Sequence, residues 1–125
     1  MISSALFAQC DCVLLPAKEA ESYFELVFRG TVQSYSHSVA VFRVSRVWKG
    51  HITRNYEMPA MGSAELCDGF PPRLLVAGNE LIVYARRVQS QWGDYVYFPL
   101  HCQTRLAKDA RQDLRQLGRG HKPRR

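Results

Sequence analysis

Within its 125 residues the sequence lacks any apolar run that approaches 18 residues, which excludes a membrane-spanning helix. It also lacks internal repeats and a G-x-S-x-G nucleophile motif. None of its four histidines, His37, His51, His101 and His121, has a carboxylate or a nucleophile at a motif spacing. The sequence therefore predicts a binding domain rather than an enzyme, with no cofactor and no metal.

The overall composition is ordinary, with 46% hydrophobic and 22% charged residues, and this argues against disorder throughout the chain. A chain of this length is typical of one domain with a core of its own. Charge is uneven, because residues 105–125 hold eight of the 17 Lys and Arg but only two of the 11 Asp and Glu. The preceding residues balance nine of each sign, so the net charge of +6 resides at the C-terminal end.

The four cysteines, Cys10, Cys12, Cys67 and Cys102, are even in number, which suggests disulfides or a metal site. Structural zinc sites usually present two C-x-x-C-type pairs, whereas this chain has one C-x-C and two isolated cysteines. Two disulfides are therefore favoured over a zinc site and over reduced, buried thiols. Disulfides persist in oxidising compartments.

The first nine residues, MISSALFAQ, are uncharged and mildly apolar. They lack the basic region of a secretory signal and are too short to be one. We interpret residues 1–9 as the remnant of a leader or as a disordered arm. Combined with the cysteines, this interpretation predicts a secreted or periplasmic protein.

Period-two alternation of apolar residues predicts mainly β structure between two helices. Strands are expected at residues 24–32, 39–48, 52–58, 80–88 and 95–100, with a short edge segment at 74–76. Residues 33–38 are expected to form a polar turn, and Lys49-Gly50 is expected to join two strands as a hairpin. Helices are expected at residues 16–23 and 104–117, the second with Thr104 as its N-cap and Gly118 at its C-terminal end.

Five strands flanked by two short helices favour a five-stranded OB-fold barrel, with a short N-terminal helix and a C-terminal helix. A β-sandwich stays open as an alternative, because periodicity does not reveal which strands pair. The domain is predicted to span residues 10–118. Residues 119–125 (RGHKPRR) are expected to form a flexible basic tail.

The order of short motifs resembles a known family. Cys10-Asp11-Cys12 is followed by Phe28-Arg29-Gly30-Thr31-Val32, Val47-Trp48-Lys49-Gly50, Ser63-Ala64-Glu65-Leu66-Cys67, Gly78-Asn79-Glu80, and Cys102 before a helix that ends in Leu117-Gly118. This set resembles the inhibitory domain of the tissue inhibitors of metalloproteinases, within the netrin-like group, and in particular its bacterial-type members. The resemblance covers residues 10–118.

The resemblance implies an OB-fold with disulfides Cys10–Cys67 and Cys12–Cys102. It further implies a protein-binding ridge, which consists of Cys10, Asp11, Cys12, Val13, Leu66 and Cys67. In the animal inhibitors, the α-amino group and carbonyl of the residue that corresponds to Cys10 chelate the protease zinc. A zinc metalloproteinase is accordingly a candidate partner, and Asp11 would face its specificity pocket. Here nine residues precede Cys10, so its nitrogen is part of a peptide bond.

Two further binding functions follow from the residues themselves. A basic surface could contact anionic envelope surfaces; its residues are Arg105, Lys108, Arg111, Arg115, Arg119, Lys122, Arg124 and Arg125. A single-stranded nucleic-acid-binding OB domain is a weaker alternative, suggested by Tyr95 and Tyr97 on one strand face near Arg86 and Arg87. The neutral body and the oxidising compartment make nucleic acid an unlikely partner.

Overall fold

The protein is a mainly β chain in which one antiparallel sheet of six strands packs against two short α-helices. The computed structural model describes residues 14–61, 69–89 and 91–125. In chain order the elements are α2 (Ala17–Tyr23), β1 (Leu26–Ser36), β2 (Val39–Lys49), β3 (Asn55–Pro59), the 3-10 turn η2 (Pro72–Leu74), β4 (Glu80–Gln89), β5 (Tyr95–Pro99), β6 (Arg105–Leu106), the 3-10 turn η3 (Ala107–Asp109) and α3 (Arg111–Leu117).

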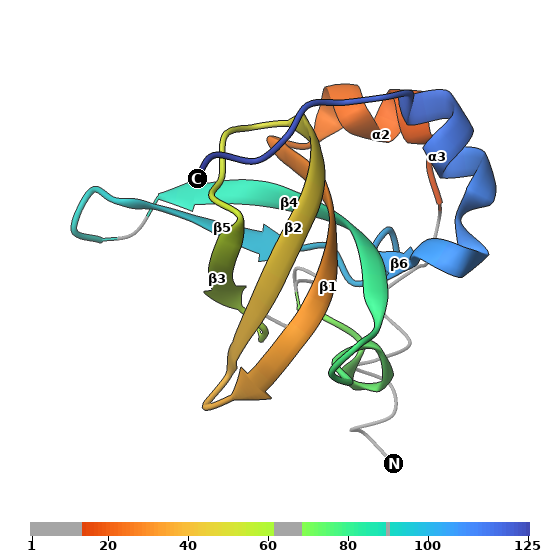
Figure 1. Cartoon of the computed structure of the whole chain (residues 1–125). Helices are drawn as coiled ribbons and strands as arrows, with labels where there is room; N and C mark the ends of the chain where they lie inside the picture. Colours follow the sequence, from red (N-terminus) through yellow and green to blue (C-terminus); the bar gives the residue numbers. More distant parts are fainter. Residues whose placement is uncertain (1–13, 62–68, 90) are drawn as a thin grey trace, which may run out of the picture.

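The strands are ordered β3-β2-β1-β4-β5, and β6 also pairs with β4. Figure 1 shows that the sheet curves so strongly that its two ends, β3 and β5, lie side by side, and these strands contact each other. Among the described residues, no hydrogen-bonded ladder joins β3 to β5, so the sheet is open along this seam. The predicted mainly β class is confirmed.

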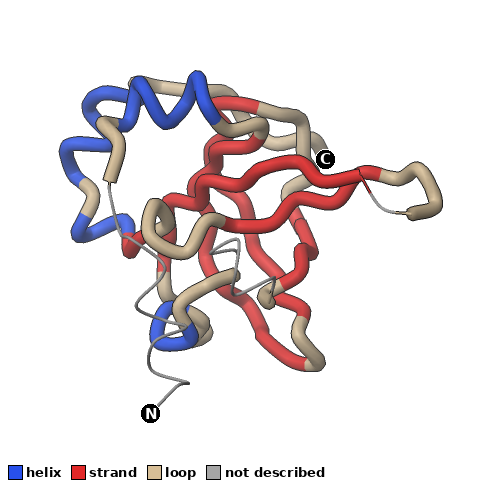
Figure 2. The backbone as a smooth tube through the Cα atoms, turned by 180° about the vertical axis from the view of Figure 1, so that it is seen from behind, coloured by secondary structure: helices blue, strands red, loops and turns tan. Residues whose placement is uncertain are grey.

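Residues 26–28 of β1 and 81–85 of β4 are buried on both faces of the sheet, which gives the domain two hydrophobic clusters. The inner cluster fills the concave side of the sheet around Phe28 and Phe42, whose rings pack edge to face with centroids 5.4 Å apart. The outer cluster joins Ile82 and Tyr84 of β4 to the two helices, which cover one side of the sheet in Figure 2. Successive strand residues point to opposite faces, so a strand covered on both sides is apolar throughout.

Several of the expected boundaries differ from the structure. β1 continues through the polar residues 33–36, and only His37 and Ser38, both with positive φ, form the turn to β2. Pairing with Val39, Ala40 and Val41 keeps this segment extended despite its polarity. The segment expected as a short edge strand at 74–76 is not a strand, because Leu74 is the last residue of η2 and Leu75 is its C-cap.

The C-terminal helix is half as long as its apolar periodicity predicts. Arg105 and Leu106 pair with Ile82 and Leu81 of β4, so they are strand residues, and α3 begins only at Arg111. Thr104 caps no helix; its hydroxyl accepts from the Tyr84 N–H at 3.2 Å. Leu106 packs on the inner cluster and Leu117 on the outer one, so they share no helical face. Pairing with β4 outweighs local helical preference here.

Residues 119–125 are not a free tail. β2 and β3 pair antiparallel, as the predicted hairpin requires, but they separate between Val44 and Arg54. The C-terminal segment occupies this opening: His121 exchanges two backbone hydrogen bonds with Val47, and Arg124 bonds the backbone of Ile52 and Arg54. Figure 1 shows the segment crossing above the sheet to end beside the β2–β3 connection. The expected flexible tail is therefore wrong, because this polar segment satisfies backbone groups at a strand edge.

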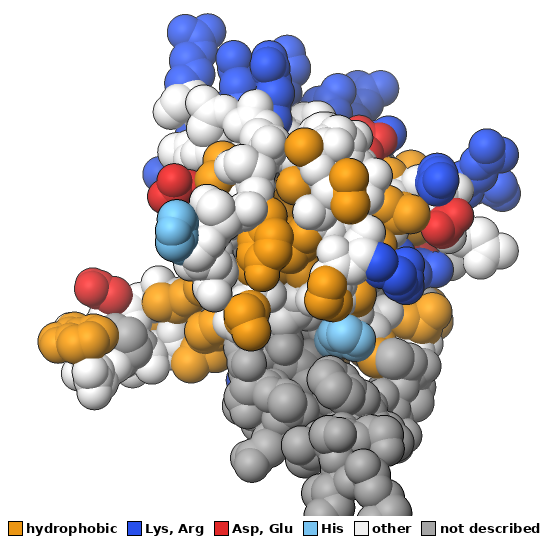
Figure 3. Space-filling view, turned by 90° about the horizontal axis from the view of Figure 1, so that it is seen from below, with side chains coloured by type: hydrophobic (Ala, Val, Ile, Leu, Met, Phe, Trp, Pro, Cys, Tyr) orange, Lys and Arg blue, Asp and Glu red, His pale blue; other side chains and the backbone are white. Residues whose placement is uncertain are grey.

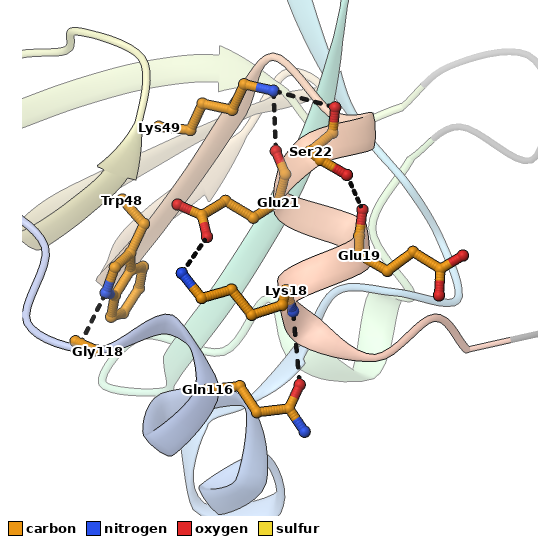
Figure 4. Close-up of polar contacts among 8 residues, drawn as sticks. All are labelled: Lys18, Glu19, Glu21, Ser22, Trp48, Lys49, Gln116 and Gly118. Atoms are coloured by element: carbon orange, nitrogen blue, oxygen red, sulfur yellow. Dashed lines mark hydrogen bonds and ion pairs between the residues drawn. The ribbon is translucent and has the colours of Figure 1, made fainter.

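Trp48 and Gly120 fasten this C-terminal segment to β2. The indole Nε1 of Trp48 donates to the carbonyl of Gly118 at 3.0 Å, a contact drawn in Figure 4. A Cβ at Gly120 would lie 2.8 Å from the Val47 carbonyl oxygen and 2.9 Å from Trp48 Cδ1. Glycine at position 120 thus allows the segment to approach both residues.

We expect Gly120→Ala to lower the free energy of unfolding by about 2–3 kcal/mol, because φ of +67° and a backbone clash both oppose a side chain. Gly118→Ala is the matched control: φ is +78° there, but nothing lies within 4 Å of its Cβ, so a loss of about 1 kcal/mol is expected. Urea denaturation measures both variants. Equal losses would contradict the close packing of the segment against β2.

Candidate functional site

The predicted ridge residues, Cys10–Val13, Leu66 and Cys67, lie outside the described residues, but the chain that borders them is described. On the N-terminal side, the backbone N–H of Leu15 donates to Oε1 of Gln103 at 3.0 Å. Nε2 of Gln103 donates back to the Leu15 carbonyl, also at 3.0 Å. Gln103 is only 2% exposed, so one buried amide holds the N-terminal segment as a neighbouring strand would.

The second border of the ridge lies on either side of residues 62–68. Met61 and Gly69 form an antiparallel bridge, and the Phe70 N–H donates to the Ala60 carbonyl at 2.9 Å. The Gly69 N–H donates to the carbonyl of Pro99, the last residue of β5, at 2.8 Å. The chain therefore leaves and re-enters the described fold at one place, beside the end of β5.

Both borders meet the same short segment, residues 99–103. Gly69 contacts its first residue, Pro99, and Leu15 contacts its last, Gln103. Cys102 lies within it, and the other three cysteines lie outside the described residues. The pairing of the four cysteines stays a prediction. Residues 99–103 are thus the point where the flanks of the predicted ridge come together.

The predicted basic surface is divided by the structure. Arg105 does not belong to it, because its Nη2 pairs with Oδ1 of Asp113 at 2.5 Å and its side chain is largely covered. Asp113 is 6% exposed and also accepts from the Tyr84 hydroxyl at 2.7 Å. Burial, followed by this hydrogen bond, raises the pKa of Tyr84 far above its usual value. These three residues form a buried polar cluster that ties α3 to β4.

The other basic residues are exposed on two elements. Lys108, Arg111 and Arg115 lie on η3 and α3, while the remaining four belong to the C-terminal segment that is fastened to β2. Seen from below, Lys and Arg gather at the top and on the right of the view, next to hydrophobic side chains in the middle (Figure 3). The cations of the C-terminal segment are consequently held at a fixed place by their backbone.

Polar contacts join α2 to β2 and to α3, and they have a structural role (Figure 4). Lys49 Nζ donates to the carbonyl of Glu21 at 2.8 Å and to that of Ser22 at 3.3 Å. These carbonyls belong to the last turn of α2, where a cation is favourable. The Lys18 N–H reaches Oε1 of Gln116 on α3 at 3.4 Å. The K-G turn of the sequence motif therefore has a structural role.

A cleft of about 450 Å³ lies at the seam between β3 and β5. Its lining includes Tyr56 and Glu57 of β3, Tyr95 and Tyr97 of β5, and His51 and Thr53 from the β2–β3 connection. Burial raises the pKa of Tyr56 to about 12, and the neighbouring Tyr97 contributes. The sequence indicated the shared face of Tyr95 and Tyr97, but no spacing signal relates them to His51 or Tyr56 about 40 residues earlier.

Across residues 14–61, 69–89 and 91–125, no three His, Cys, Asp or Glu side chains lie close enough together to hold a metal ion. Over the same ranges, no helix is long and apolar enough to cross a membrane.

Comparison with known proteins returns no matching family model, no matching curated protein and no matching solved structure.

Proposed function

We propose that this chain is a secreted or periplasmic netrin-like domain that binds a protein partner through the predicted ridge, residues 10–13 with Leu66 and Cys67. The observation that carries the proposal is the meeting of both ridge borders at residues 99–103. Two segments about 50 residues apart in sequence are thereby brought to one place next to Cys102. Such convergence is what a composite binding surface requires.

We further propose that the curved sheet is an OB-type barrel. A sheet ordered β3-β2-β1-β4-β5 whose end strands contact each other supports it, because that order places β3 and β5 where a barrel would close. The helices of the outer cluster would then cap the barrel from outside. The seam without a ladder between β3 and β5 would be the place where closure is incomplete.

The disulfides implied by the resemblance agree with the described borders. Cys12 is three residues before Leu15, and Cys102 directly precedes Gln103. Leu15 and Gln103 are hydrogen-bonded, and three extended residues span about 10 Å. A disulfide needs Cα atoms roughly 4.4–6.8 Å apart, so the Cys12–Cys102 link is within reach. By the same reasoning, the contact between Gly69 and Pro99 supports a position for Cys67 near the N-terminal segment.

Inhibition of a zinc metalloproteinase, the candidate partner, tests this proposal. In the 1–125 chain the Cys10 nitrogen is an amide, which is a very poor zinc ligand, so we expect no inhibition by chelation. A form that begins at Cys10 regains the amine and should inhibit weakly, because Asp11 would place a charge in a mostly apolar pocket. Asp11→Thr in that form should inhibit more strongly, and each tenfold gain corresponds to about 1.4 kcal/mol.

The assay measures residual protease activity against the three forms at matched concentration, with disulfides verified. Asp94→Thr in the form that begins at Cys10 is the control, since Asp94 lies exposed before β5. Strong inhibition by the 1–125 chain would mean that the ridge acts without the amine. If no form inhibits, including Asp11→Thr, the metalloproteinase is not the partner.

A further inference from the structure

The lining of the cleft between β3 and β5 differs in chemistry from the predicted ridge. Tyr95 lies at the start of β5, whereas the ridge borders meet at Pro99, where the strand ends. The β4–β5 hairpin projects from the body of the domain (Figures 1 and 2), and Tyr95, Val96 and Tyr97 of its second strand line the cleft. One wall of the cleft is therefore a strand that is paired on one edge only.

Three tyrosine rings give the cleft an aromatic surface. Tyr56 and Tyr97 pack against the inner cluster, and the Tyr56 ring lies edge-on to Phe28 with centroids 5.9 Å apart. Tyr95 is 57% exposed, and the Arg87 guanidinium lies 4.5 Å from its ring centroid. Two rings are thus held by packing while the third is open to solvent, which suits stacking of a planar ring.

The C-terminal segment runs beside the cleft and carries a cation, Arg124, which is not itself one of the lining residues. Thr53, which lines the cleft, is paired directly with Arg124 in a parallel bridge. Directly paired residues on neighbouring strands project to the same side, so the Arg124 side chain emerges on the side of Thr53. The ring of His121 lies 6.0 Å from that of His51, another residue of the lining. Arginine and imidazole groups are suited to a phosphate.

Glu57 is the acidic side chain among the lining residues, and it favours a ligand that carries a hydrogen-bond donor. A carboxylate accepts hydrogen bonds, and the exocyclic amine of cytosine is a donor that acidic side chains recognise. A nucleotide combines the three groups that this lining suits: a planar ring that stacks on tyrosine, an amine that donates a hydrogen bond, and a phosphate that binds arginine. The cleft volume of about 450 Å³ falls in the range of small-molecule sites.

We propose that this cleft binds a nucleoside phosphate, free or within a short single strand, with the base on Tyr95 and Tyr97, its amine at Glu57, and the phosphate at Arg124. The site is independent of the protein-binding ridge. The group that binds the phosphate, Arg124, belongs to the C-terminal segment. The backbone pairing of this segment places Arg124 beside Thr53.

The test is fluorescence anisotropy of labelled hexadeoxycytidylate with the oxidised 1–125 chain, at low salt and at physiological salt. Tyr95→Leu should weaken binding about tenfold or more, because the loss of one ring on which a base stacks has an effect of that size on affinity. Arg124→Gln should weaken it several-fold and reduce the salt dependence, because one phosphate contact is lost. Tyr23→Leu on α2 and Arg111→Gln on α3 are matched exposed controls and should leave binding unchanged.

Competition identifies the source of the ligand. Cytidine monophosphate that competes at a similar concentration of nucleotide indicates a site for free nucleotides, whereas competition by the strand alone indicates a single-strand site. Inorganic phosphate that competes equally well would overturn the role of the ring. Equal weakening by the control variants would overturn the site, as would binding to phosphatidylglycerol vesicles without binding to the oligonucleotide. These variants leave the ridge intact, so protease inhibition and nucleotide binding fail independently.

Discussion

Asp113→Ala is expected to lower the free energy of unfolding by about 3–5 kcal/mol, the usual cost of removing one partner of a buried ion pair. The Asp113 carboxylate is 6% exposed and holds both the Arg105 guanidinium and the Tyr84 hydroxyl. Its removal leaves a largely covered arginine and a buried phenol without their acceptor. Urea denaturation at neutral pH measures the loss.

Asp109→Ala is the matched control, because Asp109 is exposed on η3 in the same C-terminal region. We expect a change within about 0.5 kcal/mol there. A loss of less than about 1 kcal/mol for Asp113→Ala would contradict the assigned role of the buried cluster.

The same cluster predicts a loss of stability in alkali. The pKa of Tyr84 is raised in the folded state, first by burial and then by the hydrogen bond to Asp113. Its contribution is therefore complete below the unfolded value of 10.0 and is lost as the pH rises above it. Tyr84→Phe cannot ionise, so its stability should fall less steeply than that of the wild type above pH 10, once its lower starting value is subtracted.

Gln103→Ala is the second large effect, with an expected loss of about 2–4 kcal/mol. The variant removes both hydrogen bonds to Leu15 and leaves its backbone N–H and carbonyl without protein partners. Because Leu15 borders the ridge, inhibition by the form that begins at Cys10 should weaken as well. Denaturation and the protease assay report the two consequences separately.

Gln116→Ala is the control for this prediction, since Gln116 also accepts a backbone N–H from the N-terminal region. That bond is longer, 3.4 Å from Lys18, and exposed. We expect a change within about 0.5 kcal/mol. Similar losses for both glutamines would mean that the buried amide of Gln103 has no special role in holding the N-terminal segment.

Much of the sheet could be predicted because alternation is a local property of the chain. The expected strand at 80–88, apolar on both faces, corresponds to β4, and the expected strand at 95–100 corresponds to β5. The errors lie where partners far away in sequence decide the conformation. Leu106 leaves the expected helix because Leu81 pairs with it, and residues 119–125 are ordered because Val47 needs a partner at its free edge.

For the candidate sites, too, local sequence patterns were informative and contacts between distant residues were not. The ridge was inferred from cysteine spacing and a resemblance, and the structure describes only its borders. Those borders could not be foreseen, because nothing in the sequence relates Gln103 to Leu15 across 88 residues. The cleft was missed except for Tyr95 and Tyr97, because Arg124 reaches it through a backbone bridge that polar composition does not reveal.

The central claim is that two disulfides hold the ridge, Cys12–Cys102 at residues 99–103 and Cys10–Cys67 between its two segments, and peptide mapping under non-reducing conditions tests it most directly. Cleavage before aspartate separates Cys10 from Cys12 at Asp11, and trypsin, which cuts after Lys18 and Arg54, separates Cys12 from Cys67, so the two proteases together place the four cysteines in four peptides. Mass spectrometry of the oxidised protein should then find Cys12 linked to Cys102 and Cys10 linked to Cys67. A Cys10–Cys12 link, or four free thiols in protein isolated from its native compartment, would contradict the proposed ridge and location.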